Sequence, residues 1–181
     1  MTVEQTELPG VLVITPRVFR DDRGAFWETW NHRAMADAGL PESWAQDNFS
    51  VSRKNVVRGI HYQVSQPQGK LVRVTHGAVI DVAVDLRRSS PHFGKHVAVE
   101  LSGDNARMLW IPVGFGHGFL VLSETAGFAY KVTDYYAPGG ERTILWDDPE
   151  LAIPWPIDPA EAIVSAKDRA GLPLREAELF A

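Results

Sequence analysis

The sequence predicts an all-β chain that forms an antiparallel sandwich or barrel. Short β-prone runs recur between residues 11 and 135, and turns rich in Gly, Pro, Asn and Asp separate them. Helical periodicity is almost absent. The 181 residues, 45% of them hydrophobic, suit one domain with a buried core.

The first 50 residues contain the clearest helical pattern. Strands are expected over residues 11–18 and 26–30, with a turn at residues 22–24 between them. Asn31 can cap a helix over residues 31–40, because its short side chain can accept a hydrogen bond from the first turn. The sequence therefore predicts few helices, and short ones.

The middle of the chain supplies most of the predicted strands. In each one, apolar residues alternate with polar ones or form a short continuous run before a turn. These strands are expected at residues 46–52, 56–63, two within 70–86, then 95–101, 109–113, 119–122 and 127–135. Residues 114–118 are rich in glycine and are expected to form a tight loop.

Proline becomes frequent after residue 136. A stretch of this length cannot form its own core, so we expect a tail that lies across the barrel and ends in a weak helix at residues 174–180. The predicted organisation is a single domain over residues 1–181. Its core covers about residues 10–136 and its tail residues 137–181.

The composition excludes several classes of protein. A net charge of -5 argues against general nucleic-acid binding, which favours a basic surface. The chain has no cysteine, so it has no disulfide framework and no thiolate metal site. No apolar run reaches membrane-spanning length, and the first residues lack the pattern of a signal peptide. We expect no membrane partner and a cytoplasmic location.

The run from residue 56 to residue 63 carries the most informative side chains. It is apolar and β-prone, and it contains Arg58 and His61, while Lys70 opens the next strand-like run. A fixed base beside fixed cations suits removal of a proton from carbon with stabilisation of the resulting oxyanion. Taken alone, the same residues also fit a hydrogen-bonded core histidine and a surface arginine.

The spacing of Arg58 and His61 poses a geometric condition. The two residues are three positions apart, and strict alternation sends them to opposite faces of a strand. Both can line one pocket only if a bulge or bend near Gly59 intervenes. A regular strand would leave Arg58 in solvent.

Eleven separated motifs extend this interpretation along the chain. They are Phe19-x-Asp21-x-Arg23-Gly24-x-Phe26-x-Glu28, Gln46-Asp47-Asn48-x-Ser50, Arg58-Gly59-Ile60-His61-Tyr62-Gln63, Gln68-Gly69-Lys70-Leu71-Val72, Asp81-Val82-Ala83-Val84-Asp85, Ser89-Ser90-Pro91-x-Phe93-Gly94, Trp110-Ile111-Pro112-x-Gly114-Phe115-x-His117-Gly118-Phe119, Tyr130-Lys131, Tyr135-Tyr136, Trp146-x-Asp148-Pro149 and Ser165-x-Lys167-Asp168. In this order they resemble the dTDP-4-dehydrorhamnose 3,5-epimerase family. The resemblance implies a double-stranded β-helix, a cupin-like jelly roll, with a few short helices.

The same resemblance implies the reaction and the residues that perform it. The substrate would be dTDP-4-dehydro-6-deoxy-α-D-glucose and the product dTDP-4-dehydro-β-L-rhamnose, on the route to activated L-rhamnose. By position, His61 is the base, Tyr130 the acid, Asp168 the partner of His61, and Lys70 the cation near the keto oxygen. The residues that match the family's substrate contacts are Arg23, Glu28, Gln46, Asn48, Arg58, His117, Tyr136, Glu141 and Lys167. Tyr136 matches an aromatic that stacks on thymine.

The resemblance also implies a homodimer in which strands near the N-terminus lend part of the site to the neighbouring subunit. The chemistry fits these residue types. A C4 ketone acidifies the protons on C3 and C5, and a neutral imidazole can remove them near pH 7. No redox step occurs, so we expect neither a nicotinamide nor a metal, and no glycine-rich stretch fits a dinucleotide fingerprint.

Three other functions stay open from the sequence. A metal-dependent cupin would use His117, but Gln63 stands where the first metal motif of that superfamily wants a second histidine. A related enzyme that epimerises only C3, or that acts on another nucleotide sugar in an antibiotic pathway, would share the same motifs. A non-catalytic module that binds sugar nucleotides would tolerate replacement of His61 and Asp168 by alanine.

Overall fold

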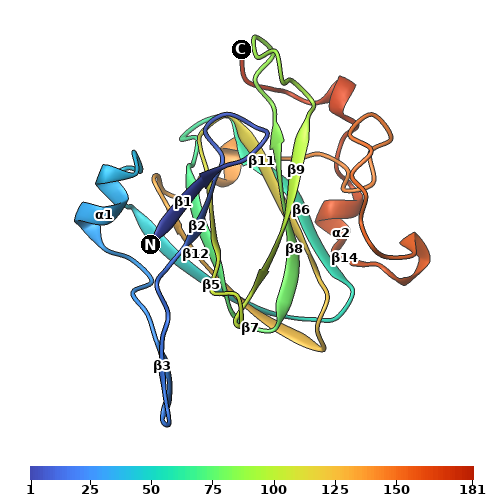
Figure 1. Ribbon diagram of the computed structural model, residues 1–181. Coiled ribbons are helices and arrows are strands. Elements are labelled where there is room, and N and C mark those ends of the chain that lie inside the picture. Colours follow the sequence, from blue (N-terminus) through green and yellow to red (C-terminus); the bar gives the residue numbers. More distant parts are fainter.

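The computed structural model describes all 181 residues and consists mainly of two facing β-sheets (Figure 1). The first sheet has six strands, all paired antiparallel. In spatial order these are β1 (Thr2–Gln5), β2 (Leu12–Thr15), β10 (Met108–Ile111), β7 (Lys70–His76), β12 (Thr125–Val132) and β5 (Gln46–Arg53).

The second sheet faces the first. Its strands in spatial order are β13 (Glu141–Thr143), β6 (Val56–Gln63), β11 (Phe115–Val121), β8 (Ala78–Asp85) and β9 (His96–Ser102), and β14 (Ile163–Val164) pairs parallel with β6. The largest hydrophobic cluster lies between the sheets, with Val72 and Phe128 from the first sheet and Ala83 and Phe119 from the second. The predicted all-β jelly roll is confirmed.

Helix α1 (His32–Asp37) covers the outer face of the first sheet. Asn31 caps it, as predicted, by accepting a hydrogen bond from the backbone N–H of Ala34. Met35, fully buried, packs from the helix against Leu71 and Trp110 on the sheet. This cover leaves the rest of that outer face, including most of β5, open to solvent.

The tail, residues 137–181, covers the outer face of the second sheet. Ile144, Leu151 and Leu174 pack there against Ile60 and Val84. The tail forms 3-10 turns η1 (Pro138–Gly140), η2 (Pro159–Glu161) and η3 (Leu174–Glu176), and helix α2 (Ala166–Arg169). Every hydrophobic cluster that contains tail residues also contains residues of the second sheet. We therefore propose that residues 1–181 form one domain.

Strands β3 (Phe19–Asp21) and β4 (Gly24–Phe26) form a separate two-stranded hairpin that projects away from the sheets (Figure 1). All of its strand residues are exposed, Phe26 by 69%. The prediction of a strand over residues 26–30 was therefore wrong. The strand ends at Phe26 because the chain then runs back to the sheet, where Glu28 accepts a hydrogen bond from the helix cap Asn31.

The glycine-rich segment at residues 114–118 was predicted as a loop, and this was wrong. Only Gly114 lies in a turn, and residues 115–118 open β11, a central strand that is buried along its whole length. A Cβ atom at Gly116 or Gly118 would collide with the side chain of Ile60 on neighbouring β6. These two glycines therefore allow close packing within the sheet, which the sequence cannot distinguish from a turn.

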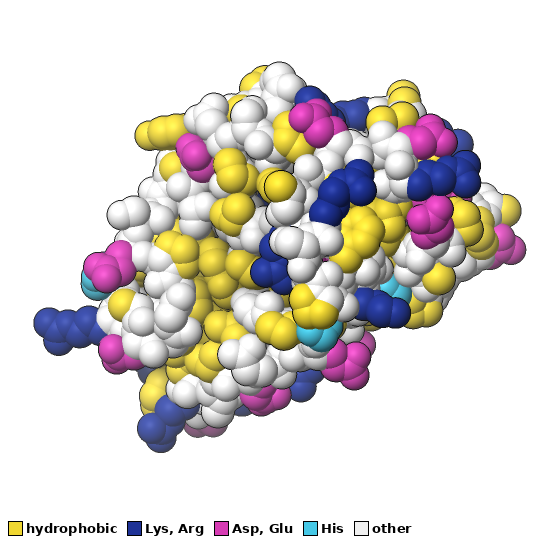
Figure 2. All heavy atoms as spheres, turned by 90° about the horizontal axis from the view of Figure 1, so that it is seen from above, with side chains coloured by type: hydrophobic (Ala, Val, Ile, Leu, Met, Phe, Trp, Pro, Cys, Tyr) yellow, Lys and Arg dark blue, Asp and Glu magenta, His cyan; other side chains and the backbone are white.

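Smaller differences concern the ends of the chain. Strand β1 and helix α2 were not predicted, and the expected helix at residues 174–180 is only the turn η3. Both α-helices are far too short to cross a bilayer. On the face shown in Figure 2, acidic and basic side chains are intermixed, without a broad region of one charge. The absence of nucleic-acid binding stays a prediction.

Candidate active site

Strand β6 contains the bulge that the sequence required. Its neighbour β11 pairs Phe119 with Arg58 and His117 with His61, so β6 has one more residue than β11 between these two pairs. The extra residue falls at Gly59, whose φ is +121° and whose α-carbon lies against the backbone of β11. Arg58 and His61 consequently share the inner face of the sheet, and the predicted bulge is confirmed.

His61 and Asp168 form a hydrogen-bonded pair. The Nε2 atom of His61 lies 2.6 Å from Oδ1 of Asp168, and the backbone N–H of Gly59 donates to the other carboxylate oxygen. Burial is the largest single effect and works to raise the pKa of Asp168, but the hydrogen bond and charge of His61, the N–H of Gly59 and the charge of Lys167 together hold that pKa below its ordinary value. A carboxylate only accepts, so Nε2 carries the proton and Nδ1 is the basic nitrogen.

Helix α2 holds Asp168 in place. Ser165 caps this helix and accepts a hydrogen bond from the backbone N–H of Asp168, whose side chain is 97% buried. The tail thus supplies one partner of the pair and the sheet supplies the other. Sequence separation between them is 107 residues, so only the folded tail brings them together.

Lys70 is a buried cation close to this pair. It opens β7 on the opposite sheet, is 8% exposed, and donates a long hydrogen bond of 3.5 Å to the backbone carbonyl of His61. Burial lowers the pKa of Lys70 to about 8, against the opposing effect of the negative charges on Asp81 and Glu141. The Lys70 side chain is therefore still mostly protonated at pH 7.

His117 lies beside His61 on β11 and is also buried. Its Nε2 donates to both oxygens of Asp81, at 3.0 and 3.2 Å. Its ring stacks on Phe128 with 5.9 Å between centroids. Burial lowers the pKa of His117 more than Asp81 raises it, which favours the neutral ring.

Tyr130 approaches the same space from the first sheet. It lies on β12, half-buried, packed against the core between the sheets and paired with Asn48 of β5. Burial raises the pKa of Tyr130, while the positive charges of Arg58 and Lys167 act in the opposite direction. Its phenol stays protonated near neutral pH and can donate.

A connected polar network forms the rim of this space. Its members come from β5, β13, α2 and the segment before η1. The Nζ atom of Lys167 lies 2.6 Å from Glu141, which also accepts a hydrogen bond of 2.8 Å from the hydroxyl of Tyr136. Gln46 accepts from the backbone N–H of Tyr136 and donates to Asn48. Tyr136 remains half-exposed, with a free ring face.

Arg23 and Glu28 do not join this group. The side chain of Arg23 is 90% exposed on the β3–β4 hairpin, where its closest partner is Asp21 at 2.6 Å. Glu28 bonds to Asn31 beside helix α1. Within one chain, eleven of the thirteen predicted site residues therefore surround the space between the sheets or its rim, and these two lie elsewhere.

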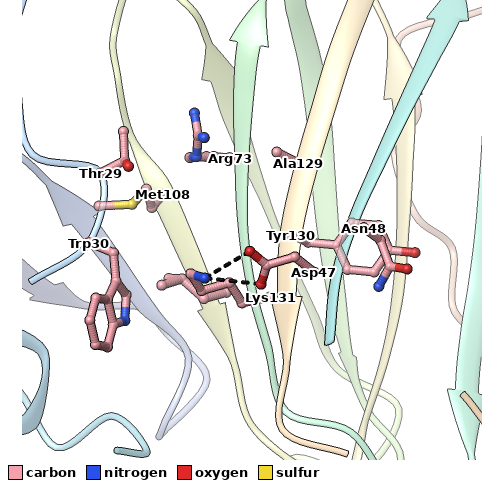
Figure 3. A pocket seen from close by; sticks show the side chains of 10 residues that line it. Thr29, Trp30, Asp47, Asn48, Arg73, Met108, Ala129, Tyr130 and Lys131 are labelled. Atoms are coloured by element: carbon pink, nitrogen blue, oxygen red, sulfur yellow. Dashed lines mark hydrogen bonds and ion pairs between the residues drawn. The ribbon is translucent and has the colours of Figure 1, made fainter. Parts of the chain in front are cut away.

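A second hollow lies on the opposite side of the first sheet, outside the barrel. Figure 3 shows Trp30 and the ion pair of Lys131 with Asp47 on this side, while the side chains of Tyr130 and Asn48 point the other way. The hollow is lined by no histidine, so it contains no imidazole paired with a carboxylate. Its chemistry therefore does not match that of the space between the sheets.

The structure offers no group of three or more His, Asp or Glu side chains placed to hold a metal ion. His61 and His117 each direct Nε2 at a carboxylate, Asp168 and Asp81 respectively. Gln63 uses its amide to bind the backbone at Tyr135 and at residue 137. The absence of a metal cofactor stays a prediction.

Sequence reasoning missed three residues that support the site. Asp81 binds His117, Ser52 accepts a hydrogen bond of 3.1 Å from Arg58, and Gln63 anchors the segment that carries Tyr136. The sequence could have pointed to Asp81, because an acidic residue inside an apolar strand needs a partner. No feature of the sequence pointed to Ser52.

The chain was then compared with known proteins. A model of the family described as dTDP-4-dehydrorhamnose 3,5-epimerase matches residues 5–176. The curated enzymes of that name from Pseudomonas aeruginosa and Escherichia coli are each 54% identical to the chain, covering 99% of both chains in the first case, and 93% of this chain and 91% of the other in the second.

A solved structure agrees with these matches. The dTDP-6-deoxy-D-glucose-3,5-epimerase from Legionella pneumophila, in complex with dTDP-4-keto-L-rhamnose, superimposes with a TM-score of 0.95 at 47% identity, covering 98% of this chain and 94% of that one. The resemblance inferred from the motifs is thereby confirmed. The chain belongs to the dTDP-4-dehydrorhamnose 3,5-epimerase family.

Proposed function

We propose that this chain is an isomerase that inverts C3 and C5 of dTDP-4-dehydro-6-deoxy-α-D-glucose and yields dTDP-4-dehydro-β-L-rhamnose. The observation that carries the proposal is the His61–Asp168 pair at 2.6 Å, with Tyr130 projecting toward the same space from the facing sheet. Family membership supports the choice of substrate. The reaction uses no cofactor, because each inversion only removes and returns a proton.

In the first step Nδ1 of His61 takes the proton from C3 or C5. The electron pair of the broken C–H bond moves into an enolate, and the negative charge develops on the C4 oxygen. Asp168 stabilises the imidazolium that forms, as the acid does in a serine-protease triad. The ammonium of Lys70 meets the oxyanion, and one preorganised donor of this kind contributes about 3–4 kcal/mol.

In the second step a proton returns to the same carbon from the opposite face, and Tyr130 supplies it. Two features support this assignment. Tyr130 and His61 lie on different sheets, and burial keeps the phenol protonated by raising its pKa. The carbon inverts because the proton leaves from one face of the sugar ring and returns to the other. Return of the proton by His61 would restore the starting configuration.

The rim residues would hold the nucleotide. Lys167 and Arg58 supply positive charge for the diphosphate, and Tyr136 offers a flat face to the thymine. Gln46 and Asn48 offer amides to its hydroxyl groups or base edge. His117 and Glu141 complete the set of proposed substrate contacts.

We also propose a homodimer in which the β3–β4 hairpin reaches the partner's site. This accounts for the position of Arg23 and Glu28, which lie away from their own chain's site. The exposed Phe19 and Phe26 on the same hairpin fit a surface that another copy covers. The hairpin then supplies the remaining charge for the diphosphate.

The reaction is tested by incubating the protein with the 4-keto sugar nucleotide, reducing the products with borohydride and identifying the sugars. Sugars of the L-rhamnose and 6-deoxy-L-talose configurations are expected, since both carbons invert before reduction. Sugars of the 6-deoxy-D-allose and 6-deoxy-D-gulose configurations would show inversion at C3 alone. Recovery of the unepimerised series would contradict both activities.

The shared site is tested by mixing His61→Ala with Arg23→Ala at a substrate concentration far below the KM of Arg23→Ala, where each variant alone is nearly inactive. If the hairpin completes the partner's site, a mixed dimer has one intact site, and random mixing restores about a quarter of the wild-type rate. Two His61→Ala preparations mixed together serve as the control. No recovery after exchange of subunits would mean that each chain uses its own Arg23.

A further inference from the structure

The interior contains a carboxylate with too few partners. Asp81 on β8 is 0% exposed, yet its only hydrogen-bond donor is Nε2 of His117, at 3.0 and 3.2 Å. Neutral imidazole cannot balance a full negative charge in a place without water. Such an anion requires a cation nearby, or folding is strongly disfavoured.

A carboxylate on the same strand shows what full compensation looks like. Asp85 is also 0% exposed, but it accepts two hydrogen bonds from the guanidinium of Arg87, at 2.9 and 2.6 Å, and one from Ser90 at 2.6 Å. These contacts fix the turn after β8. The charge of Asp85 is therefore balanced by a directly bonded guanidinium, and the charge of Asp81 has no such partner.

The cation that Asp81 needs is Lys70. Lys70 is almost as buried, has no carboxylate within ion-pair distance, and makes one long hydrogen bond to a carbonyl. His117 lies close to both groups, bonded to Asp81 and within the electrostatic reach of Lys70. Each of the two charges is the missing counter-charge of the other.

We propose that Asp81 is a positioning residue that keeps the Lys70 ammonium charged and fixes the His117 ring for catalysis. The proposal rests on the role of Lys70 at the keto oxygen given above. It adds a second acidic residue to the proposed site, in which Asp168 pairs with the other histidine. Asp81 touches no substrate, so it acts only through these two neighbours.

The titratable groups around Lys70 come from four strands. Asp81 lies on β8, His117 on β11, His61 on β6 and Glu141 on β13. Burial is the main effect on Lys70 and lowers its pKa, while the negative charges of Asp81 and Glu141 favour its charged form. Removing the charge of Asp81 should make Lys70 lose its proton at lower pH.

The test compares wild-type protein with Asp81→Asn and with Asp85→Asn as the matched control. We expect Asp81→Asn to move the alkaline limb of the kcat profile down by about one pH unit, which lowers kcat roughly fivefold at pH 8 and little at pH 6. KM should change little, because the loss concerns charge in the transition state. Asp85→Asn should leave the limb where it is.

A purely structural role for Asp81 predicts a different result, namely the same fractional loss of kcat at every pH. That result would overturn the proposal, and so would an equal displacement of the limb by Asp85→Asn. Lysine-labelled NMR of the substrate-free protein supplies a readout that does not need activity. The Lys70 signal should titrate at lower pH in Asp81→Asn, even if the proposed reaction proved wrong.

If Asp81→Asn does not fold, Lys70→Met provides the reciprocal arm. Without the ammonium, Asp81 has only His117 to balance it, so the His117 ring should hold its proton to higher pH than in the wild type. Nitrogen NMR of labelled histidine measures this directly. An unchanged His117 titration would mean that the Lys70 charge does not reach the His117–Asp81 pair, and would overturn the proposal.

Discussion

The predicted site residues between the sheets are buried and held by distant parts of the chain, whereas those on the β3–β4 hairpin are exposed. In the interior, His61 has a buried carboxylate partner at 2.6 Å, held by residues far away in the sequence. On the hairpin, Arg23 is 90% exposed, and its partner Asp21 is two residues away. The first pair is fixed by the whole fold, and the second only by a local turn.

This difference separates the chemistry from part of the binding. One chain supplies the proposed base, its orienting carboxylate, the cation and the phenol within a single packed core. The hairpin residues have no comparable support and acquire a role only against another surface. Substitutions in the interior should therefore affect kcat, and those on the hairpin should affect KM and depend on the concentration of subunits.

The largest effect is expected from His61→Ala. Loss of the general base should lower kcat by about 10²–10⁴-fold while dTDP binds almost as before, because no rim contact is removed. Product formation and calorimetric titration with dTDP measure the two quantities. His76→Ala, at the exposed end of β7, is the control. Weak dTDP binding by His61→Ala would mean that the interior also holds the nucleotide, and would contradict the separation of chemistry from binding.

A smaller effect is expected from Arg23→Ala on the hairpin. Losing one charge-assisted contact to a diphosphate should raise KM roughly 10- to 100-fold and leave kcat within a fewfold. Arg20→Ala, on the same hairpin and equally exposed, is the matched variant. Initial rates over a range of substrate concentrations separate the two constants. A fall in kcat with unchanged KM would place Arg23 in the chemistry.

The smallest effect is expected in the pH dependence of stability. The folded-state pKa of Asp168 is depressed, so its contribution is present above the unfolded value near 4 and is lost as pH falls through the folded value. Asp168→Asn should cost about 1–2 kcal/mol at pH 7 and less near pH 3, as urea unfolding would show.

The hairpin carboxylate provides the comparison for that experiment. Asp21 also has a lowered pKa, caused by its hydrogen bond with Arg23, but this pair is fully in water. Asp21→Asn should therefore leave the unfolding free energy nearly unchanged at either pH. An equal loss in both variants would remove the distinction between the two regions.

The sequence predicted the parts of the site that local rules govern. The three-residue spacing of Arg58 and His61 required a bulge, and Gly59 was the residue that could form it. It could not predict that Gly116 and Gly118 lie within a strand, because their reason is the neighbouring Ile60. Such close packing depends on residues brought together only by the fold.

The counter-charge of Lys70 escaped prediction for a similar reason. Alternation along β8 separates Asp81 from the apolar face of the strand, but both faces turn out to be buried, one by the barrel core and one by the tail. An alternating pattern normally marks the polar face as solvated. The sequence predicts that the tail lies across the barrel, but not that it covers the apolar face of β8, which leaves Asp81 on the face inside the barrel.

The central claim is that His61 removes a proton and Tyr130 returns one from the other face. Tyr130→Phe in D₂O, with the 4-keto sugar nucleotide, tests it most directly. We expect deuterium to enter at C3 and C5 by way of His61 while the configuration at both carbons is retained. Inversion at the wild-type rate, or no deuterium at either carbon, would contradict the assignment of the two residues.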